Sequence, residues 1–359
     1  EHKDHDYNYD IWETAGFGHV VYKGIAKWNF IADLQYRHID VDFRQNPAGA
    51  FQGAELNRYH LTRDFLNPRL GASYKLFDSA TAYITAGYAQ REPSPNEYWD
   101  PWAGPYAYGM DPFFNNSEIM TIGDDTLYTK WTAPAVEPEE LFNYEIGIRC
   151  RTKSFKGAVN LYLMDFRNEV VPAWGMNLGY QVTINVDKAL HRGIEAEAVW
   201  KPFSGLADII YLRGLELFGS GSYSLNTFES DFVTDTLTAE IKGNKIPLFP
   251  ELILNGGLSY SIRSNSGWTV RPWLKLRYIG EQYLEAANIE EAVIDPYGTV
   301  DAGLIIQTPK YGELPQLRFK VNVNNILDDK HETSGYYYEG SYYYPGAPRN
   351  YYAELTVGL

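Results

Sequence analysis

Long segments in which apolar and polar residues alternate are the feature that most limits how this chain can fold. In residues 268–278 every second residue forms one largely apolar face: Trp268, Val270, Pro272, Leu274, Leu276 and Tyr278. A period of two is typical of a β-strand, and helical periodicity is almost absent from the chain. The segments exceed the roughly 5–6 residues of an average globular strand and suit the roughly 9–11 residues that cross a bilayer at a tilt.

The alternation predicts an all-β chain with about thirteen long strands. The expected strands cover residues 11–22, 26–43, 61–76, 80–91, 139–152, 156–170, 187–201, 213–228, 249–263, 268–284, 296–308, 315–328 and 348–359. Aromatic residues make up 16% of the chain, and many lie near the ends of the apolar faces. Tyrosine and tryptophan favour such positions at a membrane interface, because one end of the ring is apolar and the other is wet.

The lengths of the connections alternate with the strand order. After the odd strands the links are mostly short, as at 23–25, 77–79 and 264–266. After the even strands they are long: 44–60, 92–138, 171–186, 229–248, 285–295 and 329–347. Short turns on one side and long loops on the other are typical of outer-membrane barrels, whereas a soluble sandwich or propeller has no reason to sort its loops. The sequence therefore predicts a transmembrane, antiparallel, up-and-down β-barrel.

Composition excludes several other classes. The 46 acidic residues outnumber the 31 basic ones, and the net charge of −15 argues against binding nucleic acid. Cys150 is the only cysteine, so neither a disulfide framework nor a cysteine zinc site is expected. No apolar run reaches the roughly 18 residues of a transmembrane helix. No catalytic motif is present, so we expect no enzyme activity and no cofactor.

Five segments resemble the TonB-dependent outer-membrane receptors. They span residues 91–98, 137–147, 185–195, 323–328 and 344–351, in the order in which that family carries them. The residues that match the motifs, to which we assign structural roles, are Pro93, Glu97, Glu145, Gly147, Arg192, Gly193, Glu195, Asn325, Asp328, Pro348 and Arg349. The strand alternation places Arg192 on one face and both Gly193 and Glu195 on the other.

The resemblance implies a barrel of about 22 strands that is closed by an N-terminal plug. Residues 1–359 are then one incomplete domain, the C-terminal part of the barrel, with about thirteen of those strands and no plug. The implied location is the bacterial outer membrane, with its lipid around the strands. The implied function is active uptake of a scarce nutrient, most simply a ferric siderophore, powered by the TonB complex through the missing plug.

The long loops carry the candidate ligand-binding residues. Apart from one arginine they are aromatic: Arg91, Tyr98, Trp99, Trp102, Tyr106, Tyr108, Trp174, Tyr336, Tyr337, Tyr338, Tyr342 and Tyr343. Exposed rings suit a planar or sugar-like ligand, because they stack at low entropic cost. The alternative is that they pack on one another and order the loops. Arg91 and Arg192 are among the basic residues expected in the lumen or its entrance, where they attract an anionic chelate or pair with acids such as Glu145 and Glu195.

Two further interpretations remain open. A passive, substrate-selective porin shows the same sorting of loops, and a soluble carbohydrate-active enzyme explains the aromatic residues alone. At the N-terminus, His2, Asp4, His5 and Asp6 carry imidazole and carboxylate groups that could bind a divalent metal. Such a segment is more often a solvated end, so no metal site is expected.

Overall fold

The computed structural model describes residues 6–49, 53, 56–99, 114–122, 126–173, 182–205, 212–233, 238–310, 312, 315–337 and 340–358. Its main sheet follows a path of thirteen strands: β1 (Asp6–Tyr22), β2 (Trp28–Asn46), β3 (Asn57–Phe77), β4 (Ala80–Arg91), β7 (Glu139–Arg151), β8 (Phe155–Ala173), β9 (Val182–Trp200), β10 (Leu215–Phe228), β13 (Leu252–Tyr260), β15 (Thr269–Ile279), β18 (Tyr297–Gln307), β19 (Gln316–Asn324) and β22 (Asn350–Gly358). No helix among the described residues is long and apolar enough to cross a membrane.

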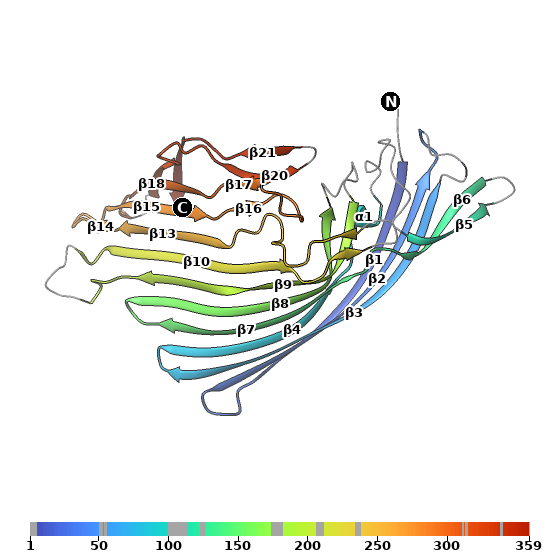
Figure 1. Ribbon diagram of the computed structural model, residues 1–359. Coiled ribbons are helices and arrows are strands. Elements are labelled where there is room, and N and C mark those ends of the chain that lie inside the picture. Colours follow the sequence, from blue (N-terminus) through green and yellow to red (C-terminus); the bar gives the residue numbers. More distant parts are fainter. Residues whose placement is uncertain are drawn as a thin grey trace.

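Each strand of this path pairs antiparallel with its neighbours, which is the up-and-down order that the loop lengths predict. The strands form one curved wall, with the N-terminal strands (blue) and the C-terminal strands (red) at opposite ends (Figure 1). All thirteen predicted strands are present in the predicted order. The first is longer than predicted, since β1 already begins at Asp6.

The long loops contain short elements that the sequence pattern did not predict. These are α1 (Pro95–Tyr98), β5 (Phe114–Ile122), β6 (Thr126–Pro134), β11 (Phe232–Val233), β12 (Thr238–Ala239), β17 (Val293–Ile294), β20 (Glu332–Tyr337) and β21 (Ser341–Pro345). The short strands β14 (Ile262–Arg263) and β16 (Gln282–Tyr283) instead lie at the ends of the predicted strands 249–263 and 268–284. The β5–β6 hairpin projects from the wall at its long-loop end (Figure 1). Its strand β6 pairs in parallel with the first residues of β3.

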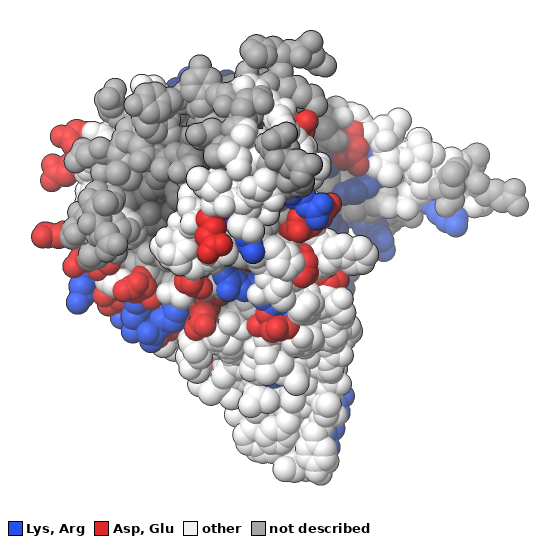
Figure 2. Space-filling view, turned by 90° about the vertical axis from the view of Figure 1, so that its right-hand side faces the viewer, with Lys and Arg blue, Asp and Glu red and all other residues white. Residues whose placement is uncertain are grey.

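The outward face of the wall is apolar over a band and then becomes polar. On β2 the outward side chains are apolar from Trp28 to Tyr36, and the next one is His38. The cross-strand partner of His38 on β3 is Asp64, and the partner of Tyr36 is Leu66. Both strands therefore change from apolar to polar outward side chains at the same level. Figure 2 shows a lower region with few charged side chains beneath a belt of acidic and basic ones. The band has the pattern of a lipid-facing surface.

Aromatic rings mark both edges of the band. At the short-turn edge Trp28 stacks on Phe30 with the ring centroids 5.5 Å apart, and Trp28 also contacts Tyr74. At the long-loop edge Tyr88 contacts Phe142 across β4 and β7 at 4.8 Å. These two rows correspond to the aromatic girdles of a membrane barrel.

On the concave face, aromatic side chains lie against glycines of the next strand. Four cross-strand pairs share this arrangement: Tyr83 with Gly147, Tyr162 with Gly193, Phe218 with Gly257 and Trp273 with Gly303. A Cβ atom added at any of these glycines would lie within 2.8 Å of the aromatic side chain. Only a residue without a side chain therefore lets the ring lie against the wall. This explains two glycines of the family-like motifs, Gly147 and Gly193.

The pair of adjacent glycines on β13 provides a test. A Cβ on Gly257 would lie 2.3 Å from the Leu274 carbonyl oxygen, whereas on Gly256 the nearest atom would be 3.9 Å away. We predict that Gly257→Ala lowers the free energy of unfolding by about 1–3 kcal/mol, because the ring and the neighbouring strand must shift. Gly256→Ala is the matched control and should change stability little. Urea unfolding in lipid vesicles measures both, and equal effects of the two substitutions would contradict the prediction.

Candidate functional site: the long-loop rim

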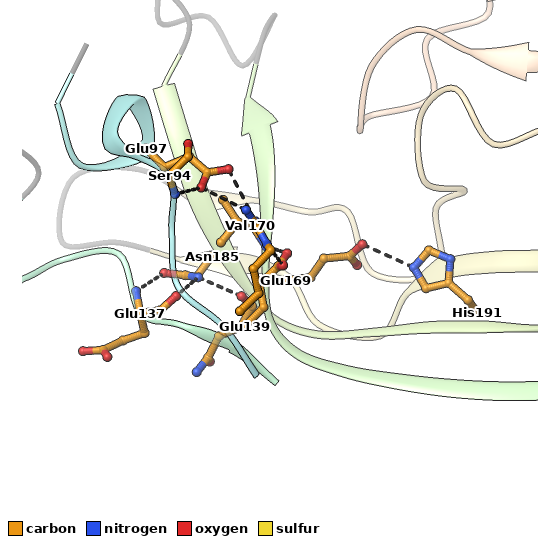
Figure 3. A network of polar contacts seen from close by, with 10 residues as sticks. Ser94, Glu97, Glu137, Glu139, Glu169, Val170, Asn185 and His191 are labelled. Atoms are coloured by element: carbon orange, nitrogen blue, oxygen red, sulfur yellow. Dashed lines mark hydrogen bonds and ion pairs between the residues drawn. The ribbon is translucent and has the colours of Figure 1, made fainter. Parts of the chain in front are cut away.

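A polar network joins four elements at the long-loop end of the wall (Figure 3). The Arg91 guanidinium at the end of β4 forms ion pairs with Glu139 on β7 and with Glu97 on α1, the latter at 3.2 Å between Nη1 and Oε2. The second oxygen of Glu139 accepts a hydrogen bond from the backbone N–H of Val170 on β8, at 2.7 Å. Such charge-assisted bonds are stronger than neutral ones, so this network fixes where the long loop after β4 begins.

The side chain of Asn185 extends the network to β9. Its Oδ1 accepts a hydrogen bond from the backbone N–H of Glu137 at 2.7 Å, and its Nδ2 donates to the carbonyl oxygens of Glu137 at 3.0 Å and of Asn168 at 2.8 Å. Asn168 has a φ of 52°, which places it in the left-handed region that asparagine tolerates better than most residues. The side chain of Asn185 therefore links β9 to the backbone at Glu137, before β7, and at Asn168, within β8. Three of the five family-like segments meet in this one network.

The short helix α1 brings two of the candidate ligand-binding rings into a buried cluster. Pro93 is buried in front of the helix, and the Ser94 N–H donates to the Glu97 carboxylate at 2.5 Å, which closes the first turn. Tyr98 is 0% exposed and Trp99 is 3% exposed. They pack with other rings on the concave side of β2 and β3: Phe43, Tyr59 and Phe114.

The burial of Tyr98 and Trp99 bears on their expected role as ligand-binding residues. The Tyr98 hydroxyl donates to Glu92 at 2.5 Å, and burial of this carboxyl raises its pKa. Arg63 lies 3.6 Å from the other oxygen of Glu92. In this arrangement neither ring is open to a ligand. Both residues pack in this cluster of rings, and their role in ligand binding stays a prediction.

A second network joins β18, β19 and β22 at the same end of the wall. Asn325, with a φ of 49°, donates its backbone N–H to Asp301 at 2.8 Å and its side-chain amide to the carbonyl oxygens of Asp329 and Ala347. The Asp328 carboxylate accepts the backbone N–H of Arg349 at 2.9 Å.

This second network gives physical roles to the last two family-like segments. Asn325 and Asp328 act through side-chain bonds to backbone, and Arg349 acts through its own backbone N–H. Pro348 lies two residues before β22 begins, where a missing N–H costs no ladder bond.

The hairpin β20–β21 carries the remaining candidate ligand-binding tyrosines that the structure describes. Its register places Tyr336, Tyr342 and Tyr344 on one face and Tyr337 and Tyr343 on the other. Tyr336 stacks on Tyr342 with the centroids 5.0 Å apart and the planes 10° from parallel. Tyr342 and Tyr344 are exposed. Tyr342 and Tyr344 therefore open this aromatic face to solvent, whereas Tyr336 is half-buried.

The opposite face of the hairpin is fastened to the neighbouring loop. The Tyr343 hydroxyl donates to the Val293 carbonyl at 3.0 Å, and Ser341 donates to the Glu291 carbonyl at 2.6 Å. Tyr337 packs against the small cluster of Leu284, Ala292 and Ile294. The hairpin is therefore held in place from behind while its tyrosine face stays open.

The concave face of β7 to β10 is polar. Glu145 accepts a hydrogen bond from Asn143 at 3.1 Å, and Glu195 accepts one from Asn160 at 3.2 Å. Glu195 and Gly193 share this face, as the alternation predicts. Arg192 points the other way, since it pairs with Leu163 on the outward face. The expectation that Arg192 lies in the lumen is therefore wrong.

A comparison with models of known protein families identifies the family of this chain. The family model for TonB dependent receptor-like, beta-barrel proteins matches residues 4–326. This chain belongs to that family. Members of the family are receptors or transporters of the bacterial outer membrane rather than enzymes. The long-loop rim of this TonB-dependent barrel therefore corresponds to the extracellular side and the short turns to the periplasmic side. No curated protein matches the chain.

Several solved receptors share the fold. The ferric yersiniabactin uptake receptor from Yersinia pestis aligns at a TM-score of 0.64 and 17% identity over 96% of this chain and 45% of its own. The ferric citrate transporter FecA aligns at a TM-score of 0.68 and 16% identity, over 98% of this chain and 46% of its own. The siderophore receptor PiuA from Acinetobacter baumannii aligns at a TM-score of 0.66 and 15% identity, over 98% of this chain and 43% of its own. The chain thus spans less than half the length of these receptors.

Several candidate residues lie outside the described residues: Trp102, Tyr106, Tyr108, Trp174, Tyr338, His2, Asp4 and His5. Asp6 begins β1. Within the described ranges, no group of three or more His, Cys, Asp or Glu residues is placed to hold a metal ion. Tyr344, a further aromatic residue of loop 329–347, lies on the same face of the hairpin as Tyr336 and Tyr342.

The Asn185 contacts predict a specific loss of stability. Asn185→Ala leaves the Asn168 carbonyl and the Glu137 N–H without their partners, and we expect it to lower the free energy of unfolding by about 1–3 kcal/mol. Asn116→Ala, on the exposed strand β5, is the control and should stay within about 0.5 kcal/mol. Denaturant unfolding of both variants measures the difference. A loss no larger than that of the control would show that the network does not stabilise the rim.

The second network predicts a dependence on pH. The Arg349 N–H and the Lys330 ammonium hold the pKa of Asp328 below its ordinary value of 3.8. The carboxylate therefore stabilises the folded state above that ordinary value, and this contribution disappears as the pH falls through the lowered pKa. Asp328→Asn should be less stable than the native chain at neutral pH and should lose less stability on acidification. Unfolding temperatures measured across this pH range test it; parallel pH curves would exclude Asp328 as the cause.

Proposed function

We propose that this chain forms the C-terminal wall of a TonB-dependent receptor that actively imports a ferric siderophore across the bacterial outer membrane. The observation that carries the proposal is the family match over residues 4–326. The named substrates of the similar solved receptors, which include ferric yersiniabactin and ferric citrate, support iron chelates as the substrate class. In this proposal the TonB complex acts through an N-terminal plug that lies outside these 359 residues.

The ligand-binding surface that we propose is the tyrosine face of β20–β21. Tyr336 and Tyr342 offer stacked rings, and Tyr344 extends them at 6.3 Å from Tyr336. Rings of this kind bind planar aromatic or conjugated groups by stacking, and they lose little side-chain entropy on binding. The contacts of Tyr343 and Ser341 with the neighbouring loop hold the surface in place before the ligand arrives.

Arg91 has a different role in this proposal. Its guanidinium is already engaged by Glu97 and Glu139, so binding an anionic chelate would require one of these ion pairs to break. We assign Arg91 to the positioning of the loop after β4. The same assignment applies to Tyr98 and Trp99, which the loop buries.

The test is uptake of radiolabelled iron chelates by cells that carry the full-length product of the source gene. Uptake should require TonB and a proton gradient, whereas uptake that persists without them would favour the passive porin. The double variant Tyr336→Ala/Tyr342→Ala should need roughly tenfold more chelate for half-maximal binding, because two stacking rings are lost. Asn116→Ala on β5 is the control, since this exposed residue lies outside the tyrosine face and outside the contacts that hold it. Unchanged binding by the double variant would exclude the tyrosine face.

A further inference from the structure

Arg192 occupies an unusual position on the outward face of the wall. It pairs with Leu163 on β8 and with Leu225 on β10, and the next outward residue toward the periplasmic side is Ile194. Its side chain is exposed. Its guanidinium makes no hydrogen bond or ion pair with any residue in the described part of the chain.

The other outward-facing cations nearby do have partners. Arg167 lies 3.3 Å from Asp165, and Lys188 lies 3.7 Å from the same carboxylate. These groups sit farther toward the extracellular end than Arg192, because Asp165 pairs with Leu190 and Arg167 pairs with Lys188. Arg167 and Lys188, above the apolar band, are therefore both paired with Asp165. Arg192, at the upper edge of the band, has no such partner among the described residues.

The surroundings of Arg192 indicate which chemical group can bind there. Its flanking leucines continue the apolar band, and Tyr144 and Tyr223 are exposed beside them. The aliphatic part of an arginine side chain packs along such a surface while the guanidinium reaches the polar layer above. The planar guanidinium matches phosphate oxygens, with two parallel hydrogen bonds.

We propose that Arg192 binds the phosphate group of a lipid headgroup in the outer leaflet of the membrane. The inference rests on the proposed placement in the outer membrane, because only that placement brings a lipid headgroup to this level of the outward face. Arg192 then has a partner outside the protein. Its role differs from that of Gly193 and Glu195, whose positions lie on the concave face. Asp165 accounts for Arg167 and Lys188, so Arg192 is the residue on which binding depends.

The experiment uses the full-length receptor, purified in detergent and stripped of bound lipid. Native mass spectrometry counts the molecules of diphosphoryl lipid A that bind as the lipid is titrated into the micelles. We expect Arg192→Gln to bind roughly tenfold more weakly and Arg192→Lys to fall between it and the native receptor. Arg318→Gln is the matched control, because Arg318 lies on the concave face of β19 and should leave binding unchanged.

Two further probes identify the source of the phosphate. Lipid A without phosphates should bind the native receptor and Arg192→Gln equally, and inorganic phosphate should not compete for the site. Equal binding of diphosphoryl lipid A by native receptor and Arg192→Gln would overturn the proposal, and so would full competition by inorganic phosphate. Loss of iron uptake in the native receptor, with lipid binding retained, would count against the proposed transport function alone. Resistance to heat denaturation, checked for each variant, distinguishes lost binding from lost folding.

Discussion

The requirement that every backbone N–H and C=O be paired in a lipid environment governs the rest of this structure. A strand in lipid has no water to satisfy its backbone, so each strand of the wall must run beside the next one in register over its full span. Strict register then fixes which residues face lipid and which face the lumen, since a shift by one residue would exchange the two sets. The alternation seen in the sequence is the direct consequence, and the concave glycines opposite aromatic rings belong to the same register.

The long, regular part of the fold could be predicted because its signals are local. Period-two alternation between Trp268 and Tyr278 is visible within eleven residues and needs no knowledge of the partner strands. The rim could not be predicted in the same way. Asn185 bonds to the backbone of Glu137, 48 residues away, and the pairing of Trp273 with Gly303 depends on a register that only the folded sheet defines. Resemblance to the family indicated that these residues matter, but only the structure shows the bonds that they make.

The loop aromatics show why composition alone could not assign the binding surface. Tyr98 and Tyr342 both lie in long, tyrosine-rich loops, yet one is fully buried and the other is exposed. The difference arises from how each loop folds beyond the last residue of its strand. After β4 a capped helix turns the chain inward over an apolar patch of β2 and β3, whereas β20 and β21 pair with each other and rest on the neighbouring loop through one face only. A two-stranded hairpin held on one side must leave its other face open, and here that face carries the stacked rings.

The segment from Arg192 to Glu195 shows how one strand serves two environments. Gly193 and Glu195 face the lumen, where the glycine accommodates the hydroxyl group of Tyr162 and the carboxylate accepts a hydrogen bond from Asn160. Arg192 and Ile194 face outward, at the level where apolar surface gives way to charge. A charged residue is costly in hydrocarbon and far less so at the headgroups, so the position of Arg192 along the strand suits the proposed headgroup level. The same register that orders the lumen thereby also fixes which residues of the strand face outward.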